Sequence, residues 1–129
     1  MADLAEKLRE IRDRFKGVSD IAENVGDGNP PSQAQLDDVT ASLGSAEGDL
    51  AIIHNSQQSP SLDPPDAGED QNPTIGTSRL ETCNDAQSLA TEAETEAGKF
   101  DPDCDYIGDR TRTLEGTYLG SIREKFGIN

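Results

Sequence analysis

Residues 3–25 read DLAEKLREIRDRFKGVSDIAENV, with an apolar side chain at every third or fourth position. The intervals alternate between four and three residues, so the apolar period is about 3.5 residues, which is typical of a helix that packs against another helix. Most of the remaining positions are charged or polar. The stretch therefore predicts a long amphipathic helix over residues 2–25, with one apolar stripe formed by Leu4, Leu8, Ile11, Phe15, Val18, Ala22 and Val25.

A second helix is predicted after the sequence GDGNPP at residues 26–31, whose glycines and prolines end the first helix. Ser32 and Gln35 have the spacing of a capping box, in which each side chain bonds the backbone N–H of the other residue. Apolar residues then recur close to the heptad period. This second stripe consists of Leu36, Val39, Leu43, Ala46, Leu50 and Ile53.

Two further helices are predicted in the C-terminal half. The first begins at another capping box, Ser78 and Glu81, and its inward face is mostly alanine, which favours close packing. The inward residues are Leu80, Cys83, Ala86, Ala90, Ala93, Ala97 and Phe100. The next helix is expected to be capped at Asp101, with Pro102 at its first position. Its apolar stripe is Ile107, Leu114, Tyr118, Ile122 and Phe126.

The composition changes between these two pairs of helices. Residues 59–76 contain four of the seven prolines and four acidic residues, which is typical of an extended linker. Short connections within each pair and a long one between them predict an all-α fold of two antiparallel helical hairpins, residues 1–58 and 77–129. We expect one helical domain over residues 1–129, whose four helices either close into a bundle or splay around neighbouring subunits.

The charge is distributed unevenly along the chain, whose net charge is −15. Residues 18–109 hold 20 acidic residues against only Arg79 and Lys99, whereas residues 1–17 and 110–129 are mildly basic. Asp outnumbers Glu by 15 to 11 and Arg outnumbers Lys by 7 to 4. This bias favours a protein that works in molar salt, where charges are screened within about 3 Å. The alternative is an ordinary acidic protein.

The supply of large apolar residues is small for a chain of 129 residues. Leu, Ile, Val and Phe together number 24, and their burial has to offset a backbone entropy cost of about 1–2 kcal/mol per residue. We therefore expect neighbouring molecules to complete the apolar stripes at the two basic ends of the chain. The contacts expected to face a partner are Leu4, Leu8, Ile11, Phe15, Tyr118, Ile122 and Phe126.

The two ends of the chain also resemble each other. Residues 8–17 read LREIRDRFKG and residues 119–127 read LGSIREKFG, so both contain the pattern Leu-x-x-Ile-Arg-acid-base-Phe. Amphipathic helices converge on such patterns, and this convergence is the favoured interpretation. The alternative is a pair of equivalent docking segments that contact repeated sites on a symmetric partner.

Catalytic signatures are absent from the sequence. Nucleophilic catalysis needs a base beside the nucleophile, and His54 is the only histidine. It is expected at the frayed end of the second helix, as a solvated or capping residue. Two cysteines and one histidine do not suffice for an ordinary structural zinc site without carboxylate ligands. We therefore predict neither a catalytic site nor a cofactor.

The acids Asp101, Asp103 and Asp105 alternate as in the opening of a calcium-binding loop. Tyr106 stands where such a loop needs glycine, and Arg112 stands where it needs a bidentate glutamate. These acids are better explained as the N-terminus of a helix, where the helix dipole favours negative charge. They are weak candidates for a cation site.

The two cysteines, Cys83 and Cys104, are predicted to be free thiols. In an antiparallel hairpin Cys83 lies about fourteen residues away from the position opposite Cys104, or about 20 Å along the helix. A disulfide allows only about 7 Å between the Cα atoms. Cys83 is expected to be buried.

Together these features predict a non-enzymatic structural or adaptor subunit of a large assembly. The leading interpretation is a capsid, neck or tail component of a virus that infects a halophilic host, located in the virion or the cytoplasm. Its partners would be copies of itself or other structural proteins, without direct contact to nucleic acid or membrane. The alternatives are an acidic regulator or nucleic-acid mimic that binds a basic protein groove, and a small assembly chaperone.

Overall fold

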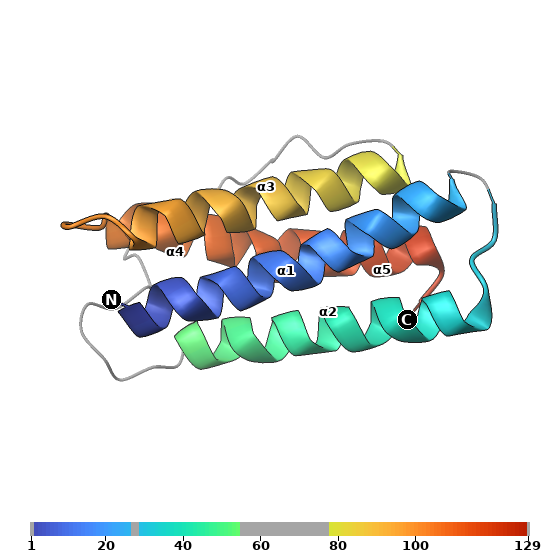
Figure 1. Cartoon of the computed structure of the whole chain (residues 1–129), viewed down its shortest axis with the longest axis horizontal. Helices are drawn as coiled ribbons and strands as arrows, with labels where there is room; N and C mark the ends of the chain where they lie inside the picture. Colours follow the sequence, from blue (N-terminus) through green and yellow to red (C-terminus); the bar gives the residue numbers. More distant parts are fainter. Residues whose placement is uncertain (1, 27–28, 55–77, 129) are drawn as a thin grey trace.

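The computed structural model describes residues 2–26, 29–54 and 78–128, and the secondary structure of these residues is entirely helical (Figure 1). The elements are α1 (Ala2–Val25), α2 (Gln33–His54), α3 (Arg79–Ala97), α4 (Cys104–Thr113), the π-helical turn η1 (Leu114–Tyr118) and α5 (Leu119–Phe126). The predicted all-α fold is thus confirmed. The predicted linker, residues 59–76, lies outside the described residues.

Helix α1 packs antiparallel against α3 (Figure 1). Near the start of α1, Arg9 Nε lies 3.3 Å from the Oε2 atom of Glu94, near the end of α3. Just beyond the end of α1, the carbonyl oxygen of Gly26 accepts a hydrogen bond of 3.4 Å from Arg79, the first residue of α3. The start of α1 therefore lies beside the end of α3, and the end of α1 lies beside the start of α3.

Helix α2 runs antiparallel to the continuous helix formed by α4, η1 and α5. Its residue Glu47 lies 3.1 Å from Arg123 of α5, whereas His54, at the end of α2, lies 3.1 Å from Glu115 of η1. Helix α1 contacts α2 on one side and α3 on the other, and α3 contacts α4. The two hairpins therefore close into a bundle and do not splay.

The serines of both predicted capping boxes cap the starts of their helices. The Ser32 hydroxyl accepts a hydrogen bond of 3.1 Å from the backbone of Gln35, and the Gln35 side chain accepts one of 2.9 Å from the backbone of Ser32. At the start of α3, the Ser78 hydroxyl accepts a bond of 3.0 Å from the backbone of Glu81. Local side-chain chemistry thus sets both helix starts.

The turn between α3 and α4 differs from the prediction. Helix α3 ends at Ala97, so Phe100 lies beyond it and is fully exposed rather than inward-facing. The N-cap of α4 is Asp103, whose side chain accepts a bond of 3.2 Å from the backbone of Tyr106. Pro102 precedes this cap instead of occupying the first helical position. The prediction of an Asp101 cap was wrong because Asp103 is the acid whose carboxylate reaches the free N–H groups of the first turn.

The apolar stripes of the helices meet in one core, which corrects the expected partner surface. Leu4 is partly buried against this core, and the other six residues expected to face a partner are at most 4 % exposed. These six are Leu8, Ile11, Phe15, Tyr118, Ile122 and Phe126. Small alanine side chains on α3 let α1 approach closely, so narrow stripes fill the interior without help from a neighbour. The repeated pattern at the two chain ends accordingly serves core packing.

The π-helical turn η1 was not predicted. The backbone N–H of Leu119 donates to the carbonyl oxygen of Leu114, five residues earlier. The stripe residues from Leu114 to Phe126 are spaced by four, and each such step turns an α-helical stripe by about 40°. One wider turn offsets this drift and keeps the whole stripe buried. The run of equal spacings was the sequence signal for it.

Candidate functional site

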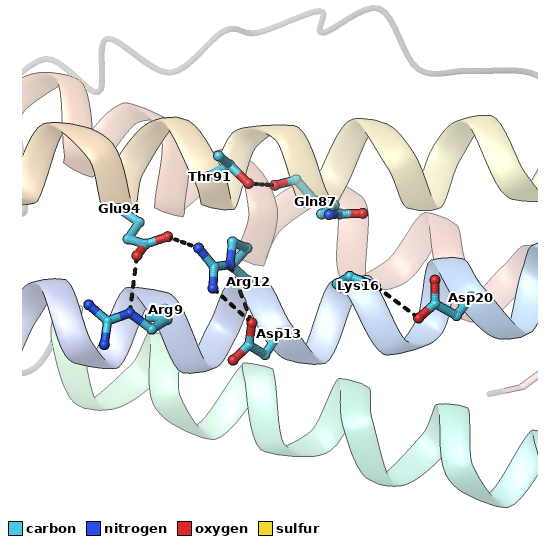
Figure 2. Close-up of polar contacts among 8 residues, drawn as sticks. All are labelled: Arg9, Arg12, Asp13, Lys16, Asp20, Gln87, Thr91 and Glu94. Atoms are coloured by element: carbon cyan, nitrogen blue, oxygen red, sulfur yellow. Dashed lines mark hydrogen bonds and ion pairs between the residues drawn. The ribbon is translucent and has the colours of Figure 1, made fainter.

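Two arginines of the basic N-terminal segment form ion pairs with one carboxylate of α3 (Figure 2). The side chain of Glu94 is 16 % exposed, and its two oxygens lie 2.5 Å from Arg12 and 3.3 Å from Arg9. Figure 2 shows all three side chains in the seam between α1 and α3. Arg12 also contacts the neighbouring Asp13 at 3.0 Å. These arginines therefore face the chain's own acidic middle.

The same matching recurs at other helix seams. Lys7 of α1 lies 3.6 Å from Asp49 of α2, and Arg110 of α4 lies 2.9 Å from Glu92 of α3. Arg123 of α5 pairs with α2 as described above. Each exposed pair contributes only about 0–1 kcal/mol, but the set favours these neighbours over others. The charge layout that suggested docking ends thus serves helix pairing within the chain.

The His54 side chain is buried and bonded to α4 and η1, whereas a solvated or capping residue was predicted. Its side chain is 3 % exposed, its Nδ1 atom lies 3.1 Å from Glu115 Oε1, and its Nε2 atom lies 2.8 Å from the Thr111 hydroxyl. A carboxylate oxygen accepts hydrogen bonds, so the tautomer of His54 that carries its proton on Nδ1 can donate to Glu115. The Thr111 hydroxyl is fully buried and also bonds the carbonyl of Ile107 at 2.9 Å. This cluster links the end of α2 to η1.

Arg79 joins three elements at the opposite end of the bundle. Its guanidinium lies 4.9 Å from the centre of the Phe126 ring and donates to the carbonyl oxygens of Lys125 at 3.3 Å and Asn29 at 3.2 Å. Together with the bond to Gly26, these contacts fix the start of α3 against the end of α5 and the α1–α2 turn. Its position as one of only two basic residues in the acidic stretch of residues 18–109 was the sequence signal for this role.

The acids named as weak cation candidates lie at the α3–α4 turn. Asp101 and Asp105 are exposed, and Asp103 serves as the N-cap of α4. Within residues 2–26, 29–54 and 78–128, no group of three or more His, Cys, Asp or Glu side chains could hold a metal ion. The N-terminal helix role favoured by the sequence is confirmed for Asp103.

The same turn contains two hydrogen bonds to one carboxylate, next to a fully exposed phenylalanine. The Glu96 carboxylate accepts from Lys99 Nζ at 3.0 Å and from the backbone N–H of Asp103 at 2.9 Å. The bond from Asp103 lowers the pKa of Glu96, and Lys99 lowers it further. Phe100 lies between these two anchored residues, with its whole side chain in solvent. We take this turn, residues 98–103, as the candidate site and call it the tip.

Both cysteines are free, and Cys83 is fully buried as predicted. Partial burial raises the pKa of the Cys104 thiol, and the carboxylates of Asp103, Asp105 and Asp101 raise it further. A raised pKa leaves less thiolate at any given pH, and the thiolate is the reactive form.

Cys104 should therefore react with Ellman's reagent more slowly than a small model thiol, and the difference should shrink as pH rises. In Asp101→Asn and Asp105→Asn chains the reaction should be faster. The Cys104→Ser chain, which keeps only Cys83, should react only after denaturant is added. Equal rates for Cys104 and the model thiol across the pH range would contradict this prediction.

The helices of the described ranges all lack the combination of length and apolar character needed to cross a membrane. Comparison with models of protein families, with curated proteins and with solved structures finds no match to this chain.

Proposed function

We propose that this chain is a non-enzymatic structural or adaptor subunit of a larger protein assembly. Its leading assignment is a capsid, neck or tail component of a virus that infects a halophilic host, acting in the virion or in the cytoplasm where the particle assembles. Partners would be other structural proteins or further copies of the chain. The observation that carries the proposal is the tip, where an ordered turn holds Phe100 in solvent on a bundle that buries its other phenylalanines.

Unfilled stripes no longer argue for a partner, because the chain fills them itself. What remains is a small helical body with its own core, a strong negative charge and one phenylalanine left in water. A body that is folded before it binds pays little ordering entropy on docking, which suits a subunit that is added to an assembly.

The assembly itself is tested by fractionating a native extract of the source organism. A structural subunit should elute in a large complex and be found by mass spectrometry in purified particles. An assembly chaperone would be in complexes but not in finished particles. A regulator or nucleic-acid mimic would instead be bound to one basic protein and released by molar salt. A chain that elutes only at its own 13.8 kDa in both low and high salt would refute the proposal.

The halophilic setting predicts that the bundle becomes more stable as salt rises. Surplus carboxylates repel one another in dilute buffer, and molar salt shortens the screening length to about 3 Å. The short ion pairs between helices are weakened too, but acids outnumber basic residues by 26 to 11, so relief of repulsion should dominate. The midpoint of thermal unfolding, followed by far-ultraviolet circular dichroism, should rise from low to molar potassium chloride.

Two variants give the matching control. Glu23 and Asp38 are exposed acids, so Glu23→Gln and Asp38→Asn remove repulsion without adding salt. Both changes should raise the low-salt midpoint and reduce its rise with salt. A midpoint that falls or stays constant in molar salt would count against a halophilic origin.

A further inference from the structure

We propose that the tip docks by inserting Phe100 into an apolar pocket of a partner protein whose rim is basic. This inference rests on the proposed function and names the surface and the chemistry through which it operates. It requires that Phe100 be available, that its backbone be held in place, and that the surrounding charge select one class of partner.

Phe100 is available because nothing in the bundle covers it. Its relative exposure is 105 %, whereas Ile52, the other exposed large apolar residue of the described chain, is 59 % exposed. In Figure 1 the α3–α4 turn extends beyond the start of α1 and the end of α2. Isolated exposed apolar side chains are common on protein surfaces, so exposure alone would not single out Phe100. The construction of the turn does.

Residues on both sides of Phe100 bond one carboxylate, Lys99 through its side chain and Asp103 through its backbone. Glu96, whose side chain is only 13 % exposed, bonds both Lys99 and the backbone of Asp103. The backbone N–H groups of Gly98 and Lys99 also bond the last carbonyls of α3, at 3.1 Å each. Aromatic anchors dominate many interfaces, and an anchor on an already ordered turn loses less entropy when it docks.

The charge around the tip favours a basic partner. Asp101, Asp103 and Asp105 are all exposed, and the ammonium of Lys99 is paired with Glu96. At contact distance, where molar salt screens charges least, these acids favour a basic surface and repel a second copy of the tip. A self-association through this tip would bring like charges together. The occupant is therefore a different protein, with Lys or Arg around an apolar pocket.

A phage library of disulfide-cyclised peptides, which can fold around a single side chain, supplies the probe. Selection on the immobilised full chain should enrich peptides that combine large apolar residues with Lys or Arg. Synthetic copies of these peptides should bind Phe100→Ala about thirtyfold more weakly than the unaltered chain, as expected for an interface anchor. Binding to Ile52→Ala, the matched exposed site, should be unchanged. The double change Asp101→Asn and Asp105→Asn should slow association and flatten its salt dependence.

The inference is overturned if no peptide is enriched, if the enriched peptides lack basic residues, or if they bind Phe100→Ala as tightly as the unaltered chain. Circular dichroism of each variant shows that a loss of binding is not a loss of folding. Failure here while the chain is still found in purified particles would remove the tip but leave the proposed function. If the selection succeeds but the chain never enters a complex, the tip is supported as a docking surface and the proposed function is refuted.

Discussion

Phe15→Ala should bring the bundle close to unfolding, whereas Phe100→Ala should leave its stability nearly unchanged. Phe15 of α1 lies in the core and is 0 % exposed, and truncating such a side chain lowers the free energy of unfolding by about 3–5 kcal/mol. Small domains are stable by only about 5–15 kcal/mol in total. Phe100 lies in water, and surface changes of this kind usually shift stability by about 0.5 kcal/mol or less.

Chemical unfolding followed by circular dichroism measures both variants, in salt that keeps the unaltered chain folded. The pair is matched because the same atoms are removed from the two sites. The unfolding midpoint of the unaltered chain should also be independent of protein concentration, since a self-contained core needs no second molecule. A small effect of Phe15→Ala, or a midpoint that rises with concentration, would restore the view that the stripes face a partner.

His54→Ala should have the second-largest effect, a loss of about 1–3 kcal/mol of unfolding free energy. The change removes the imidazole that bonds both the Glu115 carboxylate and the Thr111 hydroxyl. Each of these two groups then lacks one hydrogen-bond partner in a largely buried position. The Glu115 side chain is 30 % exposed, so water can replace part of the hydrogen bonding that its carboxylate loses. The loss should therefore fall below that of Phe15→Ala.

A double-mutant cycle isolates the His54–Glu115 contact. In a Glu115→Gln background, His54→Ala should cost less than it does in the unaltered chain, because the charged acceptor has already gone. Thr40→Ala is the control, since its exposed hydroxyl only bonds the carbonyl of Leu36 in its own helix. Additive costs in the cycle would show that the His54–Glu115 contact contributes nothing to stability.

The helix boundaries were predictable because the signals that set them are local. The two capping boxes and the GDGNPP turn act within a few residues, and α1 spans the range that its apolar period predicts. The α3–α4 turn was misplaced because several acids compete for one cap. Which of Asp101 and Asp103 reaches the free backbone groups depends on where α3 ends.

The candidate site was not predictable as a site. Phe100 follows the period of the α3 stripe, and a periodic pattern does not show that the helix has stopped three residues earlier. The sequence similarly places His54 at the end of a helix, but it does not show that α4 and η1 pack beside its side chain. The equal spacing of the apolar residues from Leu114 to Phe126 indicates the π-helical turn, but only if all of them are assumed to lie in one core.

The sequence by itself determined the order of the helices, the starts of α2 and α3 and most of the amphipathic faces, because caps and apolar periods act between residues that are neighbours along the chain. Only the tertiary structure decided what those faces meet. Pairings such as Arg12 with Glu94 and Glu47 with Arg123 join residues that are far apart in sequence. An apolar stripe has the same pattern whether its own chain or another molecule covers it, so the assembled bundle alone shows that the stripes are used internally and that Phe100 is left outside.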